Sequence, residues 1–167
     1  IVQDGGRCDM CFGMKGGENP ANFQEIADML TQAGIETTVS NTIELDSWKK
    51  LAITGSMSAI LCYYDGTIGE CRAYADAQEI IPAAYREVQS VAAATGVQMS
   101  DNYIETLIKN FNTSEPSTIT SLYRDLKSGK APQDTELDLM VGYVVNKGKE
   151  LGVPTPVFEA GYNRFNK

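Results

Sequence analysis

Apolar residues dominate positions 43–64, which we predict to form one long helix. In its first half, Leu45, Trp48 and Ala52 recur at helical spacing, whereas the second half carries no charge and is apolar on nearly every side. A helix that is apolar all round is usually buried at the centre of a domain. The charges of the first half leave too short an uncharged run to span a membrane. We therefore expect the rest of the chain to pack around this helix.

Beyond this central helix, apolar positions keep a helical period to the end of the chain. Glycine and proline residues separate the periodic segments, and hydroxyl residues precede several of them, as at helix starts. Thr67 and Ser100 are expected to cap two of them. Ser117 is expected to open a third, and Thr135-x-x-Asp138 is a capping signal for a fourth. The predicted helices span residues 67–74, 76–95, 100–111, 117–129, 135–151 and 157–165.

The first 41 residues have a different pattern. Arg7 to Met14 alternates loosely and predicts a strand, and the β-branched run 35–40 predicts a second one. Between them, residues 20–33 predict a helix with Asn19 as its N-cap and Gly34 as its stop. We interpret this small strand–helix–strand order as the tail of a larger arrangement. Because the chain starts at Ile1 rather than Met, we expect a fragment or a processed product.

The composition restricts which partners, catalytic groups and metal ligands this chain can have. The formal net charge of −8, without a Lys/Arg cluster, argues against a nucleic-acid partner. The absence of His removes the commonest general acid–base and the commonest zinc ligand. Cys8-x-x-Cys11 has no second pair at zinc-ribbon spacing, so no metal site is predicted. Reduced cysteines in the cytoplasm are the expected state.

Polar residues interrupt the central helix at a regular interval. Lys50, Thr54 and Ser58 are four residues apart, so they lie above one another on one helix face. A buried stripe of this kind needs polar partners, because each unpaired group costs about 1–3 kcal/mol. Either Lys50 lies at the rim with its stem reaching water, or this face lines a polar pocket.

Four motifs occur in an order and spacing that resemble a known family. Each alone is weakly specific, but their combination covers essentially the whole chain. They are Trp48-Lys49-Lys50-Leu51-Ala52, Ile68-Gly69-Glu70, Ser121-Leu122-Tyr123-Arg124-Asp125-Leu126 leading to Thr135-Glu136-Leu137-Asp138, and Gly152-Val153-Pro154-Thr155-Pro156. Together they resemble the C-terminal domain of the ketopantoate reductase (2-dehydropantoate 2-reductase) family.

The resemblance implies a mainly α fold. It consists of an all-helical C-terminal domain of the 6-phosphogluconate dehydrogenase C-terminal-like type, preceded by a short strand–helix–strand segment left over from a Rossmann domain. Residues 1–41 would be the tail of that NADP-binding domain and the connection, and residues 42–167 the substrate-binding domain. The glycine-rich phosphate loop would lie upstream of Ile1, so we expect this fragment alone to be inactive.

The resemblance also implies an activity. Family members use NADPH to reduce 2-dehydropantoate to pantoate in pantothenate biosynthesis, and we expect this or a related 2-oxo acid to be the substrate. NADPH would be bound mainly by the protein's own N-terminal Rossmann domain. That domain and the 2-oxo acid are the expected partners, a homodimer is compatible with the resemblance, and neither nucleic acid nor a membrane is expected.

Site residues follow position by position from the motifs. Lys50 takes the place of the catalytic lysine, where an ammonium can stabilise and then protonate the alkoxide that hydride transfer leaves. Glu136 matches a glutamate that contacts cofactor or substrate, and Ser121 matches a substrate-binding serine. Thr54 and Ser58 occupy substrate-binding positions. A glutamate in a first helical turn is also favoured by the helix dipole, and a helix-surface serine is ordinary, so both keep structural alternatives.

The chain departs from the family at the substrate positions. Asparagines are usual where Thr54, Ser58 and Ile68 stand, and a hydroxyl replaces only part of an amide's hydrogen bonding. The alternative is therefore a non-catalytic relative that keeps the fold for dimerisation or ligand binding. A dehydrogenase of the opine or phosphogluconate type shares the architecture, but the motifs at 135–138 and 152–156 fit it less well.

Overall fold

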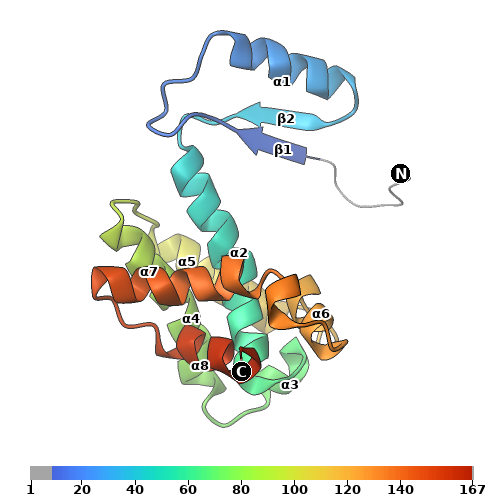
Figure 1. Cartoon of the computed structure of the whole chain (residues 1–167), viewed down its shortest axis with the longest axis vertical. Helices are drawn as coiled ribbons and strands as arrows, with labels where there is room; N and C mark the ends of the chain where they lie inside the picture. Colours follow the sequence, from blue (N-terminus) through green and yellow to red (C-terminus); the bar gives the residue numbers. More distant parts are fainter. Residues whose placement is uncertain (1–8, 167) are drawn as a thin grey trace. The chain divides into compact units, whose positions relative to one another are not determined.

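The computed structural model describes residues 9–166 and divides into two compact units, Ile1–Ser47 and Trp48–Lys167. The first unit is a β–α–β element. Strand β1 (Asp9–Phe12) pairs in parallel with β2 (Glu36–Val39), with Asp9 opposite Glu36 and Phe12 opposite Val39. Helix α1 (Asn22–Gln32) connects them (Figure 1). The predicted strand Arg7 to Met14 is thus shorter at its C-terminal end, and its residues 7 and 8 lie outside the described part.

The prediction that Asn19 caps α1 is wrong. Ala21 occupies the N-cap and makes no side-chain cap. The side-chain amide of Asn19 instead joins two backbone groups that are far apart in the sequence. Its Oδ1 accepts from the Met14 N–H (2.6 Å), and its Nδ2 donates to the Ser40 carbonyl (2.9 Å). A side chain that serves such distant backbone groups is not available to the helix N-terminus.

Helix α2 (Ile43–Tyr64) has the predicted bounds. From Trp48 onward it belongs to the helical unit, and most of its second half is fully buried, including Ala59, Ile60, Leu61 and Cys62. Other helices contact it along its length. The Ser56 hydroxyl lies 3.5 Å from the Ala84 carbonyl of α4, and a Cβ on Gly161 of α8 would lie 2.7 Å from the Ala59 carbonyl. The prediction that this helix forms the centre of the domain is confirmed.

The helices that follow α2 in the chain lie around its second half (Figure 1). Two of them begin as predicted: Thr67 forms a capping box with Glu70 at the start of α3, and the Ser100 hydroxyl accepts from the Tyr103 N–H at the start of α5. Elements after α2 are α3 (Ile68–Arg72), α4 (Ala77–Ala94), α5 (Asp101–Thr113), α6 (Ser121–Lys127), a 3₁₀ turn η1 (Pro132–Asp134), a π-helical turn η2 (Asp138–Gly142), α7 (Tyr143–Leu151) and α8 (Pro156–Phe165). The mainly helical fold class is confirmed.

The predicted helix start at Ser117 is wrong. Helix α6 begins after Thr120, not at Ser117, and Ile119 is 37% exposed instead of buried. The predicted capping signal Thr135-x-x-Asp138 is confirmed for the threonine and wrong for Asp138. The Thr135 hydroxyl accepts from the Leu137 N–H (3.2 Å), while Asp138 accepts a hydrogen bond from Tyr162.

Within residues 9–166, none of the helices combines the length and the apolar character that a membrane crossing requires.

Candidate functional site

Lys50 and Thr54 lie on the α2 face that the spacing predicts. Lys50 is exposed, and its ammonium makes no hydrogen bond or ion pair with another residue of the described chain. Thr54 is half-buried and its hydroxyl donates to the Lys50 carbonyl, at 2.9 Å. The preceding Lys49 differs, because its ammonium lies 5.6 Å from the centre of the Tyr103 ring. Solvent reaches this face at Lys50 and in part at Thr54, so Lys50 lies at a rim, as one of the two alternatives expected.

Ser58 is fully buried and contacts a different helix. Its hydroxyl donates to Thr120 Oγ1 at 3.0 Å, and the same Thr120 oxygen accepts from the Tyr123 N–H (3.2 Å) as the N-cap of α6. Ser121, the first residue of α6, is exposed. The hydroxyl pair therefore fixes the helix terminus that carries Ser121 against α2. Ile68, at the third position where the family has asparagine, is fully buried in α3 and faces the core.

Glu136 is exposed in the turn that precedes η2. Its backbone carbonyl accepts from the Met140 N–H at 2.9 Å, whereas its carboxylate makes no hydrogen bond or ion pair with another described residue. Two contacts bring the next residues against α2. A Cβ on Gly55 would lie 3.9 Å from the Met140 carbonyl, and the rings of Trp48 and Tyr143 are 5.9 Å apart. Residues 140–143 thus lie against the α2 face that carries Trp48 and Gly55, and Lys50 is turned away from both positions by about 140–160° around the helix axis.

The arrangement offers an ammonium, hydroxyls and a carboxylate, the groups needed to bind a carboxylate or carbonyl and to donate a proton. Among residues 9–166 no three His, Cys, Asp or Glu side chains are grouped as metal ligands. Cys8 of the Cys8-x-x-Cys11 pair lies outside that range. A cavity of about 430 Å³ lies away from these groups and is lined by Arg72, Ala77, Gln78, Ile81, Pro82 and Asn112.

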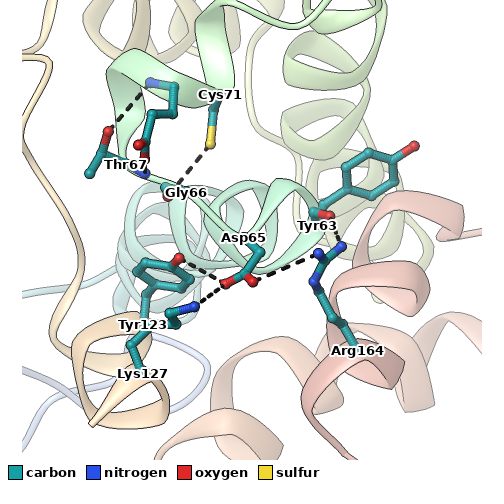
Figure 2. Close-up of polar contacts among 9 residues, drawn as sticks. Tyr63, Asp65, Gly66, Thr67, Cys71, Tyr123, Lys127 and Arg164 are labelled. Atoms are coloured by element: carbon teal, nitrogen blue, oxygen red, sulfur yellow. Dashed lines mark hydrogen bonds and ion pairs between the residues drawn. The ribbon is translucent and has the colours of Figure 1, made fainter.

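A polar cluster at the C-terminal end of α2 was not predicted (Figure 2). Asp65 has φ of 60° and accepts from the Tyr123 hydroxyl and the Lys127 ammonium, both at 2.9 Å. Arg164 lies 3.8 Å from the same carboxylate and donates to the Tyr63 carbonyl at 3.0 Å. Burial alone would raise the pKa of Asp65, but the hydrogen bonds from Lys127 and Tyr123 outweigh it and hold the pKa below its usual value. This cluster ties α2, α6 and α8 together.

A second carboxylate inside the helical unit is also fully engaged. Glu87 of α4 is 7% exposed, and its two oxygens accept from the backbone N–H groups of Val157 and Phe158, at 2.9 and 3.0 Å. It thereby caps α8, whose own N-cap residue Thr155 makes no side-chain cap. Burial raises the pKa of Glu87 above its usual value, although the two backbone hydrogen bonds act in the opposite direction.

Comparisons with known proteins bear on these residues. The family model described as "Ketopantoate reductase PanE/ApbA C terminal" matches residues 42–167. A 2-dehydropantoate 2-reductase of Pyrobaculum aerophilum is 31% identical over 144 residues, which cover 86% of this chain and 50% of that protein. The chain spans about half the length of the curated relatives it matches.

Solved structures have the same fold. D-mandelate dehydrogenase, solved with NADH and anilino(oxo)acetate, superposes with a TM-score of 0.79 at 22% identity, covering 98% of this chain and 67% of that one. A dimeric ketopantoate reductase from Staphylococcus aureus gives 0.76 at 17% identity, covering 87% and 50%. With the family match over residues 42–167, the chain belongs to the ketopantoate reductase family.

Proposed function

We propose that this chain is the substrate-binding, catalytic-lysine part of an NADPH-dependent reductase that converts 2-dehydropantoate, or a related 2-oxo acid, to the 2-hydroxy acid. The observation that carries the proposal is Lys50. It stands in the motif Trp48–Ala52 that resembles the lysine motif of the family, and its ammonium is without a partner among residues 9–166. An exposed and unpaired ammonium beside a polar face is free to meet an anionic substrate.

In this proposal Lys50 acts on the carbonyl oxygen. NADPH, when bound, supplies the hydride that forms the new C–H bond at the carbonyl carbon. The electron pair of the C=O π bond then moves to oxygen, and the Lys50 ammonium stabilises the alkoxide and gives it a proton. Stabilisation of this kind is worth most where water is excluded, so we propose that a second domain covers the face during the reaction.

The other groups bind and orient. Ser121, at the exposed N-terminal end of α6, would donate a hydrogen bond to the substrate carboxylate. Thr54, whose hydroxyl proton is donated to the Lys50 carbonyl, would accept from a substrate hydroxyl. Glu136 would accept from a substrate hydroxyl or from the cofactor. Ser58 is fully buried and bonded to Thr120, which supports a role in placing Ser121 as well as in completing the polar face.

The nucleotide needs a binding site that these residues do not supply. The sequence contains no G-x-G-x-x-G motif, whose backbone holds a dinucleotide pyrophosphate at a helix N-terminus. The parallel pair β1–β2 with α1 between them is the unit from which such domains are built. We therefore propose that residues 1–41 belong to the protein's own NADP-binding Rossmann domain, and that residues 42–167 close over it.

Two further features complete the proposal. Burial raises the pKa of Cys62 and of Cys71 to about 12, and both are free thiols, which fits a reducing compartment such as the cytoplasm. The likeness to a dimeric ketopantoate reductase supports a homodimer.

The test is a substrate screen on the complete protein that the gene encodes. NADPH oxidation would be followed at 340 nm with 2-dehydropantoate, other branched 2-oxo acids and 2-oxo acids bearing an aromatic ring, and each reaction would be repeated with NADH. We expect turnover with at least one branched 2-oxo acid and preference for NADPH. No oxidation with any acid, under conditions where the protein is folded and binds NADPH, would exclude the reductase function.

A non-catalytic ligand-binding module is the second candidate. It is favoured by Thr54 and Ser58, whose hydroxyls already donate to the Lys50 carbonyl and to Thr120. A module of this kind would bind a 2-oxo or 2-hydroxy acid, measured by calorimetry, without oxidising NADPH.

A further inference from the structure

The turn between Glu136 and α7 is a π-helix. Residues Asp138–Gly142 have this form, and the ordinary α-helix begins only at Tyr143. A π-turn holds one more residue than an α-turn, is less stable, and occurs often at functional sites. Leu139 within it is 76% exposed and contributes little to the core. Something other than local sequence preference must therefore hold this geometry.

Helix α8 supplies the anchor. The Tyr162 hydroxyl donates to Asp138 Oδ1 at 2.6 Å, and this hydrogen bond is the main reason why the pKa of Tyr162 is raised, which keeps the phenol protonated as a donor. At the other end of the turn, a Cβ on Gly142 would lie 2.8 Å from the edge of the Tyr162 ring. The tyrosine thus contacts the first and the last residue of the π-turn.

The extra residue of the π-turn rotates the segment that precedes the turn about the helix axis. Successive residues of an α-helix are rotated by about 100° about the axis, so one added residue turns the preceding segment by that amount. Glu136 lies two residues before the π-turn, while residues 140–143 are held against α2 by the Met140 and Tyr143 contacts. The direction of Glu136 relative to Lys50 on α2 therefore depends on whether the turn stays a π-turn.

We propose that Tyr162 is a positioning residue: through Asp138 and Gly142 it holds the π-turn that directs Glu136 toward the substrate. The inference rests on the proposed reductase function and names a residue of α8 that none of the motifs contains. Tyr162 itself would touch neither substrate nor cofactor.

A double-mutant cycle in the complete protein tests this. Tyr162→Phe should lower kcat/KM for NADPH-dependent reduction of the preferred 2-oxo acid by about fivefold or more. In a Glu136→Gln background the same change should have less than about a twofold effect, because residues that act as a unit are not additive. The loss of thermal stability caused by Tyr162→Phe should be the same in both backgrounds. Tyr143→Phe is the matched control and should leave kcat/KM unchanged, because the Tyr143 hydroxyl has no described hydrogen bond.

A second set of variants covers the case in which Tyr162→Phe does not fold. Asp138→Asn keeps an acceptor for the phenol and should retain most of the activity, whereas Asp138→Ala should match Tyr162→Phe. Deletion of Leu139 would let the turn close as an α-helix and should cut kcat/KM at least about tenfold, while Leu139→Ala should change it less than about twofold.

The outcomes separate the two proposals. Equal losses from Tyr162→Phe with and without Glu136, or full activity after deletion of Leu139, would overturn the positioning role while the reductase function stands. If the wild-type protein binds NADPH but reduces no 2-oxo acid, the reductase function is excluded and the positioning role with it.

Discussion

Helix α2 carries two groups of polar side chains with opposite surroundings. At its C-terminal end, Asp65 is held by Tyr123, Lys127 and Arg164 from two other helices (Figure 2). About four turns earlier, Lys50 is exposed and its ammonium has no partner in the described chain. The same contrast separates Glu87, with both oxygens bonded to the start of α8, from exposed Glu136.

The contrast separates structure from function. A charged group with a complete set of partners in its own fold contributes to stability, and a ligand could reach it only by breaking those contacts. A charged group that a helix face presents without partners contributes little to stability and is free for a ligand. We therefore assign the Asp65 cluster and Glu87 to the fold, and Lys50 and Glu136 to the proposed reaction. This division between fold residues and reaction residues can be tested by substitution, beginning with the largest expected effect.

Lys50→Ala should reduce activity and leave stability unchanged. Loss of a proton donor that also stabilises the alkoxide should lower kcat by about 10²–10⁴-fold. NADPH affinity, measured by fluorescence titration, should change little because the face contributes no phosphate-binding loop. Lys49→Ala is the matched control, since Lys49 is the adjacent lysine but faces the Tyr103 ring. Equal activity of Lys50→Ala and wild type would remove Lys50 from the mechanism.

Asp65→Ala should reduce stability and leave activity nearly unchanged. It leaves the Tyr123 hydroxyl and two cations without their acceptor, and it places alanine at a φ of 60°, so unfolding in urea should show a loss of about 2–3 kcal/mol. Asp65→Asn should lose about half as much, because asparagine tolerates this backbone conformation and keeps an acceptor. Activity of either variant below its melting temperature should stay within about twofold of wild type. A large drop in kcat of the folded Asn variant would contradict the division.

The pH dependence sharpens this test. Because the pKa of Asp65 is lower in the fold than in the unfolded chain, its stabilisation is fully present above the usual aspartate pKa, near 4. That stabilisation is lost as the pH falls through the lower folded value. The acid-dependent part of the stability should therefore be smaller in Asp65→Asn than in wild type.

Patterns of neighbouring residues correctly predicted the features that depend on short-range interactions. The bounds of α2, the caps at Thr67 and Ser100 and the shared face of Lys50, Thr54 and Ser58 depend on neighbours within a turn, and the structure has them. Predictions failed where a distant partner competed for a side chain. Tyr162, 24 residues away, takes the Asp138 carboxylate from the expected capping signal, and a π-turn forms there.

The candidate site has the same limit. Spacing placed Lys50 and Ser58 on one face, but it could not tell that one is exposed and the other fully buried against Thr120, 62 residues later. The Asp65 cluster was missed because its members come from three helices and only the Asp65-Gly66 turn is visible in the sequence. Glu87 comes three residues after Ala84 and four before Val91, and this place on the apolar stripe of α4 is the pattern that could have marked it as buried and bonded.

Glu87→Gln should lower stability at pH 7 by about 1–2 kcal/mol, because the amide keeps one acceptor oxygen but turns a donor toward the other backbone N–H. Its pH dependence should be opposite to that of Asp65. Burial raises the pKa of Glu87 in the fold, so the group stabilises most below its unfolded pKa and less as the pH rises through the folded one. The stability of wild type minus that of Glu87→Gln should therefore decrease from pH 4 to pH 7. An increase over that range would mean that the hydrogen bonds outweigh burial.

Ser58 has features of both groups. Its replacement has the smallest expected effect, and it tests whether this residue belongs to the fold or to the substrate site. Its hydroxyl is buried and bonded like a structural group, yet its partner Thr120 begins the helix that carries Ser121. Ser58→Ala should lower stability by about 1 kcal/mol and, if α6 positions substrate, should raise KM for the 2-oxo acid severalfold with kcat nearly unchanged. Ser56→Ala is the matched control, since that hydroxyl lies 3.5 Å from the Ala84 carbonyl and its loss should not change KM. Equal KM values in the two variants would place Ser58 with the Asp65 cluster, as part of the fold alone.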